Sequence, residues 1–195
     1  MTDTIASNIN HTVTLASGGT FGNPVTVASG VTVTGNNGFV VAAGNAWTIR
    51  NHGSIAGTGS AGQTGYGVYF KQSEGSLAND GVISGNSFAV YGFQASGPVT
   101  VDNSGRLNGG VAGVRFANGG DPLTLTNETG GTIGGGYNGI WVDGGSGTVT
   151  NAGTISGTAR AVNIRGGAGS VDNSGLIQAT GSGSTGDGVY FDTGG

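Results

Sequence analysis

The sequence predicts an all-β protein, a single-stranded right-handed parallel β-helix (β-solenoid) of about six regular coils after an irregular N-terminal cap. Three observations favour this fold. Glycine accounts for 45 of 195 residues and charged residues for only 8%, against ~7% and ~25% in average proteins. Apolar residues alternate with period 2 in short runs, and no stretch has the 3.6-residue period of a helix. One motif also recurs at a nearly constant interval.

The recurring motif is Asn-x-Gly, extended to Asn-Glu-Thr-Gly in the fourth copy. Its copies are separated by 28, 24, 24, 24 and 22 residues. A unit of this length that holds only short strands cannot bury its apolar side alone, so neighbouring units must stack. The anchor asparagines are Asn51, Asn79, Asn103, Asn127, Asn151 and Asn173.

Each unit supplies three strands. The first has an aliphatic residue two positions before the asparagine: Ile49, Leu77, Val101, Leu125, Val149 and Val171. The second has one four positions after it, or six in the fourth unit: Ile55, Ile83, Leu107, Ile133, Ile155 and Ile177. The third strand follows at 67–70, 89–93, 113–116, 139–142, 161–164 and 188–191. Parallel pairing with the equivalent strand one turn later would place Val101 between Leu77 and Leu125, and parallel crossovers favour the right hand.

Two parts follow from this pattern. Residues 47–195 form the regular repeats of about 24 residues. Residues 1–46 lack the anchor but keep the alternation, so we expect an N-terminal cap and irregular starting coils, which protect the open first rung of a repeat array. No matching cap is visible at the other end, where the sequence stops after a third strand, so we expect the native protein to continue.

Charge and composition exclude several classes of protein. A net charge of −4 with six basic residues cannot form a phosphate-neutralising face, so we expect no nucleic acid partner. The absence of cysteine excludes disulfides and thiolate chemistry. The longest apolar run, 39–43, is too short to span a bilayer. No signal peptide follows Met1, so an exported protein would have lost its signal.

The iterated "N-x-G-x-I-x-G … G-V-x-F … G-G" units over about 47–195 resemble the passenger regions of bacterial autotransporters, the adhesins of type V secretion. The resemblance implies a non-enzymatic rod at the bacterial cell surface, or secreted, that mediates adhesion or aggregation. Its partners would be a host or matrix glycan or protein, or a second copy. It also implies a C-terminal β-barrel translocator in the full-length protein, no membrane insertion by this segment, and no cofactor.

The anchor asparagines are predicted to be structural. Identical amides stacked one coil apart can donate to one another along the axis and accept from turn N–H groups. Asparagine also tolerates the sharp turn that separates two strands.

The candidate ligand site is an outward column on the third strand. If Val68 and Phe70 point inward, Tyr69 points outward, and its equivalents do the same. Such a column could stack on sugar rings or meet a partner surface. The alternative is that the aromatic side chains only stabilise the sheet. The column contains Tyr69, Tyr91, Arg115, Trp141 and Tyr190, with Asn163 between the last two.

Catalytic chemistry has weaker support. Asp143, Arg165 and Asp192 follow the third strand in successive coils. They form either an ion ladder on the surface or a substrate-binding arginine flanked by acids, as in a polysaccharide-active enzyme. Asp102 and Asp172 are three coils apart, ~14 Å, too far for a glycosidase pair. We therefore expect neither catalytic residues nor a metal site.

Three further features are the histidines, two enlarged loops and a column of hydroxyl side chains. His11 and His52 are isolated in the repeat frame. Enlarged loops at 56–66 and 179–188 occur at the same place in the coil, where repeat proteins often carry function. A column of hydroxyl side chains on the first strand raises the possibility of ice binding, although the outward column two residues later is not uniform. That hydroxyl column is Thr48, Ser76, Thr100, Thr124, Thr148 and Ser170.

Overall fold

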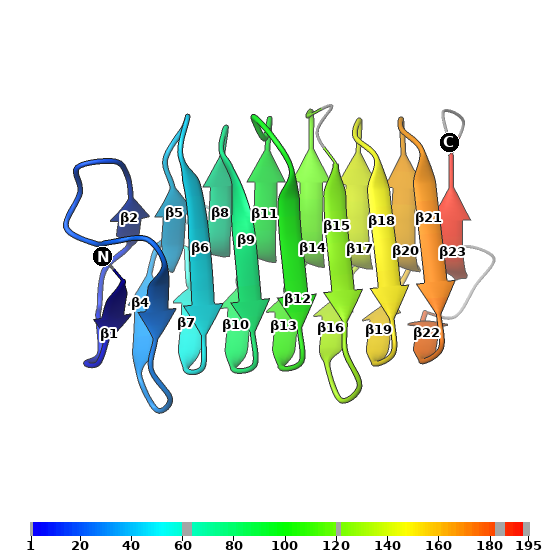
Figure 1. The fold of residues 1–195 in the computed structure, drawn as a ribbon. Helices are drawn as coiled ribbons and strands as arrows, with labels where there is room; N and C mark the ends of the chain where they lie inside the picture. Colours follow the sequence, from blue (N-terminus) through cyan, green and yellow to red (C-terminus); the bar gives the residue numbers. More distant parts are fainter. Residues whose placement is uncertain (1, 60–63, 120–121, 182–185, 193–195) are drawn as a thin grey trace.

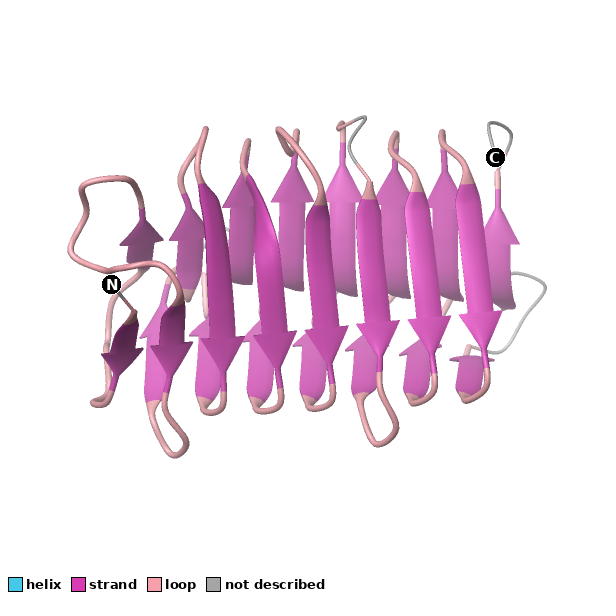
Figure 2. Cartoon of the chain, viewed as in Figure 1, coloured by secondary structure: helices cyan, strands magenta, loops and turns pink. Residues whose placement is uncertain are grey.

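The chain is a parallel β-helix whose strands form three parallel sheets, A, B and C, with no helix in the described residues (Figure 2). The computed structural model describes residues 2–59, 64–119, 122–181 and 186–192. In Figure 1 the chain descends through the front sheet and rises through the rear one while it advances from N to C, so the coil is right-handed, as predicted.

Sheet A holds the first strand of each coil. Its members are β1 (Asp3–Ile5), β3 (Val25–Val27), β6 (Ala46–Asn51), β9 (Glu74–Asn79), β12 (Val99–Asn103), β15 (Leu123–Asn127), β18 (Gly147–Asn151) and β21 (Gly169–Asn173). Sheet B holds the second strand. Its members are β4 (Thr32–Gly35), β7 (Ser54–Gly57), β10 (Val82–Gly85), β13 (Arg106–Gly109), β16 (Thr132–Gly135), β19 (Thr154–Gly157) and β22 (Leu176–Ala179).

Sheet C holds the third strand, which forms the rear of the rod in Figure 1. Its members are β2 (Val13–Leu15), β5 (Phe39–Val41), β8 (Tyr66–Lys71), β11 (Phe88–Phe93), β14 (Ala112–Ala117), β17 (Asn138–Asp143), β20 (Arg160–Arg165) and β23 (Asp187–Phe191). From β4 onward each strand pairs in parallel with the strand three places later, one coil along the axis.

The register is the one that the repeat alignment predicts. Val101 pairs with Leu77 on one side and with Leu125 on the other. Ile83 pairs with Ile55 and Leu107. These side chains are 0–1% exposed and belong to one core cluster that continues along the rod. Since successive residues of a strand face opposite sides, the alternate positions are left for the surface.

The N-terminal segment joins the same three sheets. β3, β4 and β5 pair with β6, β7 and β8, so residues 25–41 form a coil although they lack the anchor asparagine. Val27 occupies the position of Asn51. The loop after β2 carries Phe21, which packs against the core, while Ile5 and Leu15 in the first coil are buried. The opposite end differs, because Val189 and Phe191 of β23 are exposed.

The asparagine ladder consists of the six anchor asparagines at the turn between sheets A and B. In the first five, Nδ2 donates to Oδ1 of the asparagine in the next coil, at 2.7–2.8 Å. The same Nδ2 donates to a carbonyl of its own turn, as Asn127 does to Gly131 at 3.2 Å. It also donates to the first residue of the next sheet B strand, as Asn127 does to Thr154 at 3.3 Å. The ladder therefore ties each turn to its successor, as predicted.

Candidate functional site

The outer face of sheet C carries the aromatic column, namely Tyr69, Tyr91, Arg115, Trp141, Asn163 and Tyr190. The register places these residues side by side in consecutive coils. Val68 and Phe70 are fully buried, so Tyr69 between them faces outward as expected. The column is half-buried, except that Asn163 is only 1% exposed.

The N-terminal half of the column is part of a cluster of aromatic rings. Tyr69 and Tyr91 stack with centroids 5.3 Å apart and planes 21° apart. Tyr66 and Phe88, three residues before them, form a second stacked pair at 5.6 Å. Tyr91 also contacts Tyr66 at 4.6 Å and Phe88 at 5.0 Å. Within the two stacked pairs, the rings cover part of one another's faces.

In the C-terminal half of the column, guanidinium groups contact the aromatic rings. The Cζ of Arg115 lies 3.9 Å from the Trp141 ring centroid, and that of Arg165, from the coil on the other side, lies 5.6 Å from it. Arg160 lies 3.9 Å from the ring of Tyr190. Each contact is a cation–π interaction, worth ~0.5–1 kcal/mol at an exposed site. The Trp141 ring is thus flanked from both neighbouring coils.

This geometry changes the sugar-stacking hypothesis. A sugar stacks on a free aromatic face. In this fold the coils are ~4.8 Å apart, so side chains in register lie close enough to stack on one another. Tyr69 and Tyr91 stack on each other, and Arg115 lies over Trp141. A ligand on this face therefore meets mainly ring edges, hydroxyls and guanidinium groups.

The Asp143 carboxylate pairs with two arginines. Arg165 contacts Asp143 Oδ1 through Nη2 at 2.8 Å and Nε at 2.9 Å, and Arg115 Nη2 lies 3.6 Å from Oδ2. The predicted alternation of charge is therefore present between these neighbours, and Asp192 follows in the next coil. A carboxylate held by two guanidinium groups is a counter-ion, which favours the ion-ladder interpretation over a catalytic one.

Burial alters the acidity of the tyrosines in the cluster. Burial, together with the neighbouring Tyr91 and Tyr66, raises the pKa of Tyr69 to about 12. The pKa of Tyr91 is also raised by burial and by Tyr66, against an opposing effect of Arg115. Both hydroxyls stay protonated at neutral pH, so they can donate hydrogen bonds to a partner.

Several buried polar atoms near Trp141 lack a hydrogen-bond partner. They are the Nε1 of Trp141, the Nε of Arg115, the Oδ1 of Asn163, and both side-chain polar atoms of Asn138. Asn138 is fully buried, three residues before Trp141 on β17. Unpaired buried polar groups cost free energy. The buried polar side chains in this half of the face therefore have fewer of their hydrogen bonds formed than those of the asparagine ladder.

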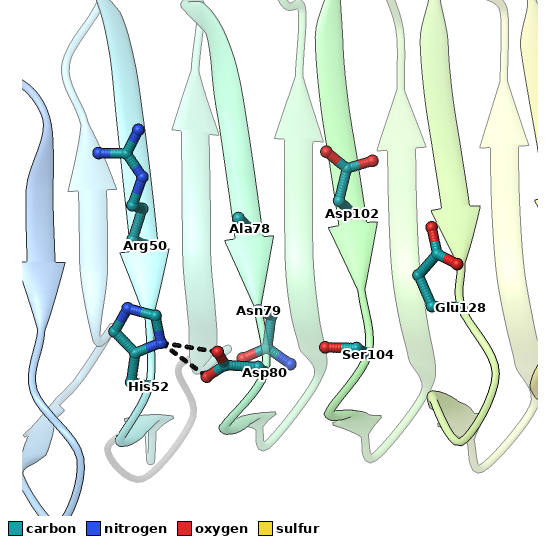
Figure 3. A pocket seen from close by; sticks show the side chains of 8 residues that line it. All are labelled: Arg50, His52, Ala78, Asn79, Asp80, Asp102, Ser104 and Glu128. Carbon is teal, nitrogen blue, oxygen red and sulfur yellow. Dashed lines mark hydrogen bonds and ion pairs between the residues drawn. The ribbon is translucent and has the colours of Figure 1, made fainter.

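A second feature lies where sheet A turns toward sheet B. A hollow of about 150 Å³ is lined there by Arg50, His52, Ala78, Asn79, Asp80, Asp102, Ser104 and Glu128 (Figure 3). Ala78 stands between Arg50 and Asp102 in the register, so the small side chain leaves the hollow open.

Within this hollow, His52 Nδ1 lies 2.7 Å from Asp80 Oδ2. The prediction that His52 is isolated was therefore wrong. The signal was present in the alignment, because His52 and Asp80 each follow an anchor asparagine in successive coils. Asp80 lies between His52 and Ser104 (Figure 3), whereas a serine triad needs the histidine in the middle. These three residues therefore do not form a serine triad.

The other predicted positions are found as follows. Asp102 and Asp172 are exposed, as expected of outward positions. The hydroxyl column is in register, with Ser76 Oγ donating to Thr48 Oγ1 at 3.1 Å. His11 lines a separate hollow near Asn10 and Thr34. The enlarged loops 56–66 and 179–188 lie partly outside the described residues, at 60–63 and 182–185.

The described residues contain no group of three or more His, Cys, Asp or Glu side chains that could hold a metal ion. No helix in that part of the chain is long and apolar enough to cross a membrane.

Comparisons with protein-family models, with curated proteins and with solved structures gave no match.

Proposed function

We propose that this chain is a rod segment of a bacterial surface adhesin of the autotransporter type, without enzymatic activity, and that it binds a protein partner through the outer face of sheet C. The observation that carries the proposal is the composition of that face, where tyrosine, tryptophan and arginine side chains gather along one column. These three residue types dominate the binding hot spots of protein interfaces.

The arrangement of the face also favours a protein partner over a glycan. The rings of Tyr69 and Tyr91 are held by stacking, and Arg115 is held by Trp141 and Asp143. Side chains already fixed in position lose little conformational freedom on binding. Paired ring faces are poor platforms for sugars but leave edges and hydroxyls for a protein surface. A glycan and a second copy of this chain are the alternative partners.

The test is an adhesion assay with the purified chain on immobilised extracellular matrix proteins, a glycan array and a layer of the same chain. We expect binding to a matrix protein, reduced by at least about tenfold in Tyr91→Ser and Trp141→Ser. Thr124→Ala, an exposed position on sheet A, is the control and should keep wild-type binding. Wild-type binding by both aromatic variants would remove sheet C from the interface.

The alternative of a polysaccharide-active enzyme would depend on the Arg165–Asp143 pair, since such enzymes use an arginine beside acidic groups. Release of reducing ends from a polysaccharide, abolished in Arg165→Ala, would replace the adhesin proposal. We expect no release from pectic or other acidic polysaccharides. A thermal-hysteresis measurement tests the alternative of an ice-binding solenoid. We expect no hysteresis, because the outward column two residues after the hydroxyl column is not uniform.

A further inference from the structure

The outer face of sheet B has a notch that none of the functions above uses. It is a hollow of about 200 Å³ over β16, between β13 and β19. The outward residues that line it are Arg106, Asn108, Thr132, Gly134, Thr154 and Ser156. In the register Gly134 lies between Asn108 and Ser156, which form the two walls. Two coil spacings separate the walls, ~10 Å.

The notch exists because Gly134 has no side chain, and the fold does not require glycine there. A Cβ on Gly134 would lie 3.3 Å from Asn108 Oδ1 and 3.7 Å from Ser156 Oγ, and the residue is in an ordinary strand conformation. By contrast, a Cβ on the next residue, Gly135, would collide with the carbonyl of Asn138. Glycine inside a strand costs ~0.5–1 kcal/mol relative to alanine, so Gly134 opens the notch at some expense of stability.

The lining of the notch is rich in hydrogen-bond donors. Arg106 supplies a guanidinium group, Thr132, Thr154 and Ser156 supply hydroxyls, and Asn108 supplies an amide. None of the residues that line the notch is acidic. In the described part of the chain the Arg106 side chain has no ion pair or hydrogen bond to another residue. This set of groups suits an acidic group surrounded by hydroxyls.

The backbone that carries these groups is held by the asparagine ladder. Asn79, Asn103 and Asn127 donate through Nδ2 to the carbonyls of Arg106, Thr132 and Thr154, at 3.3–3.4 Å. These three residues begin the strands that form the floor and walls. Binding sites on rigid elements keep their geometry better than sites on loops.

We infer that the notch binds a single sugar unit of a glycan, and that this unit bears a carboxylate or a sulfate group. The acidic group pairs with Arg106, and the ring hydroxyls exchange hydrogen bonds with Asn108, Thr154 and Ser156. A volume of about 200 Å³ is below the ~300–1,000 Å³ of pockets for larger ligands, which limits the occupant to one ring. This site goes beyond the proposed function, because it adds a glycan subsite on a different sheet.

The binding test is an NMR titration of the ¹⁵N-labelled chain with four probes: trigalacturonate, a sulfated galactose trisaccharide, neutral galactotriose and inorganic sulfate. We expect at least one acidic trisaccharide to shift the amides of β13, β16 and β19, and neutral galactotriose to bind at least about tenfold more weakly. The carboxylated and sulfated probes distinguish the two acidic groups. Equal binding of galactotriose, equal binding of inorganic sulfate, or no shift with any saccharide would overturn the inference.

The matched variants fill or spare the notch. Gly134→Thr places a strand-forming side chain in the notch and is expected to weaken binding by at least about tenfold, while Arg106→Gln removes the charge and weakens it by about fivefold or more. Ala56→Thr alters the same outward column in a coil before the notch and should bind as the wild type. Wild-type binding by Gly134→Thr, checked as folded by circular dichroism, would refute the site.

The two proposals fail independently. Tyr91→Ser leaves the notch intact and should keep acidic-sugar binding, whereas Gly134→Thr leaves sheet C intact and should keep adhesion to protein. Loss of sugar binding in Tyr91→Ser would contradict the separate site.

Discussion

Two columns of side chains follow the same register along the rod, and they use it differently. The asparagine ladder lies inside a turn, and its five amide-to-amide bonds of 2.7–2.8 Å are nearly identical. The aromatic column lies on the outer face of sheet C, where the contacts differ from coil to coil: Tyr69 stacks on Tyr91, whereas Arg115 lies over Trp141.

The difference shows how a solenoid divides its positions between fold and function. A buried turn has unpaired carbonyls in every coil, so one side chain that satisfies them is repeated without change. An outward strand position has no such requirement, and its residues vary while the backbone stays the same. Binding specificity is therefore expected in the varied columns, and stability in the uniform one.

The largest effect is expected in the ladder. Asn127→Ala removes the donor to Gly131, Asn151 and Thr154, and it removes the shortest of the three hydrogen bonds that Asn103 Nδ2 donates. We expect a loss of ~1–3 kcal/mol in the free energy of unfolding, measured by urea titration, because buried polar groups become unpaired. Asn173→Ala, at the exposed end of the ladder, is the control and should cost less. Equal losses would mean that the ladder is not a buried structural element.

A smaller effect is expected in the aromatic column. Tyr91→Ser removes ring contacts with Tyr66, Tyr69 and Phe88. Aromatic pairs are worth ~0.5–1.5 kcal/mol each, and partial exposure reduces the sum, so we expect a loss of about 1–2 kcal/mol in the same titration. A loss larger than that of Asn127→Ala would reverse the assignment of stability to the ladder and specificity to the column.

The pH dependence of stability tests the packing of the same column. The pKa of Tyr69 is raised to about 12 in the folded chain, against ~10 in an unfolded one. Between these values the folded state holds the proton that the unfolded state has lost, so stability falls as pH rises from about 10 to 12. We expect Tm to fall over this window, and to fall less in Tyr69→Phe than in the wild type. The difference in Tm between the two proteins at pH 8 gives the effect of packing alone. An unchanged pH slope in Tyr69→Phe would contradict the burial of this hydroxyl.

The smallest effect is expected at the exposed pair of His52 and Asp80. Their side chains are 46% and 53% exposed. Exposed ion pairs contribute ~0–1 kcal/mol and are screened by salt. Asp80→Asn should therefore change the free energy of unfolding by less than about 0.5 kcal/mol, and by less still in 1 M salt. A loss comparable to that of Tyr91→Ser would make this pair a structural element.

The fold could be predicted from the repeat because the spacing and the alternation of apolar residues fix the register. Aligning the anchor asparagines was enough to place Val101 against Leu77 and Leu125. Residues 25–41 were harder to place, since Val27 replaces the asparagine and only the period-2 alternation remains. Their coil is identified by strand pairing, which sequence alternation alone does not specify.

The site was predicted in part. The alignment showed which residues share the column of Tyr69, but it could not show that Tyr69 stacks on Tyr91 or that Arg115 covers Trp141. Those contacts depend on side-chain torsions, which adapt to the neighbours in the coils on both sides. The alignment places His52 and Asp80 at the same position of successive coils, but it does not show that their side chains meet.

The sequence by itself determined the parallel β-helix, its register, its core and its asparagine ladder, because a repeat of nearly constant length brings equivalent residues of successive coils into register. Only the tertiary structure decided which surfaces are open. The notch over Gly134 depends on the missing side chain between Asn108 and Ser156. The stacked aromatic rings and the paired Asp143 depend on contacts between side chains of neighbouring coils, which are ~4.8 Å apart.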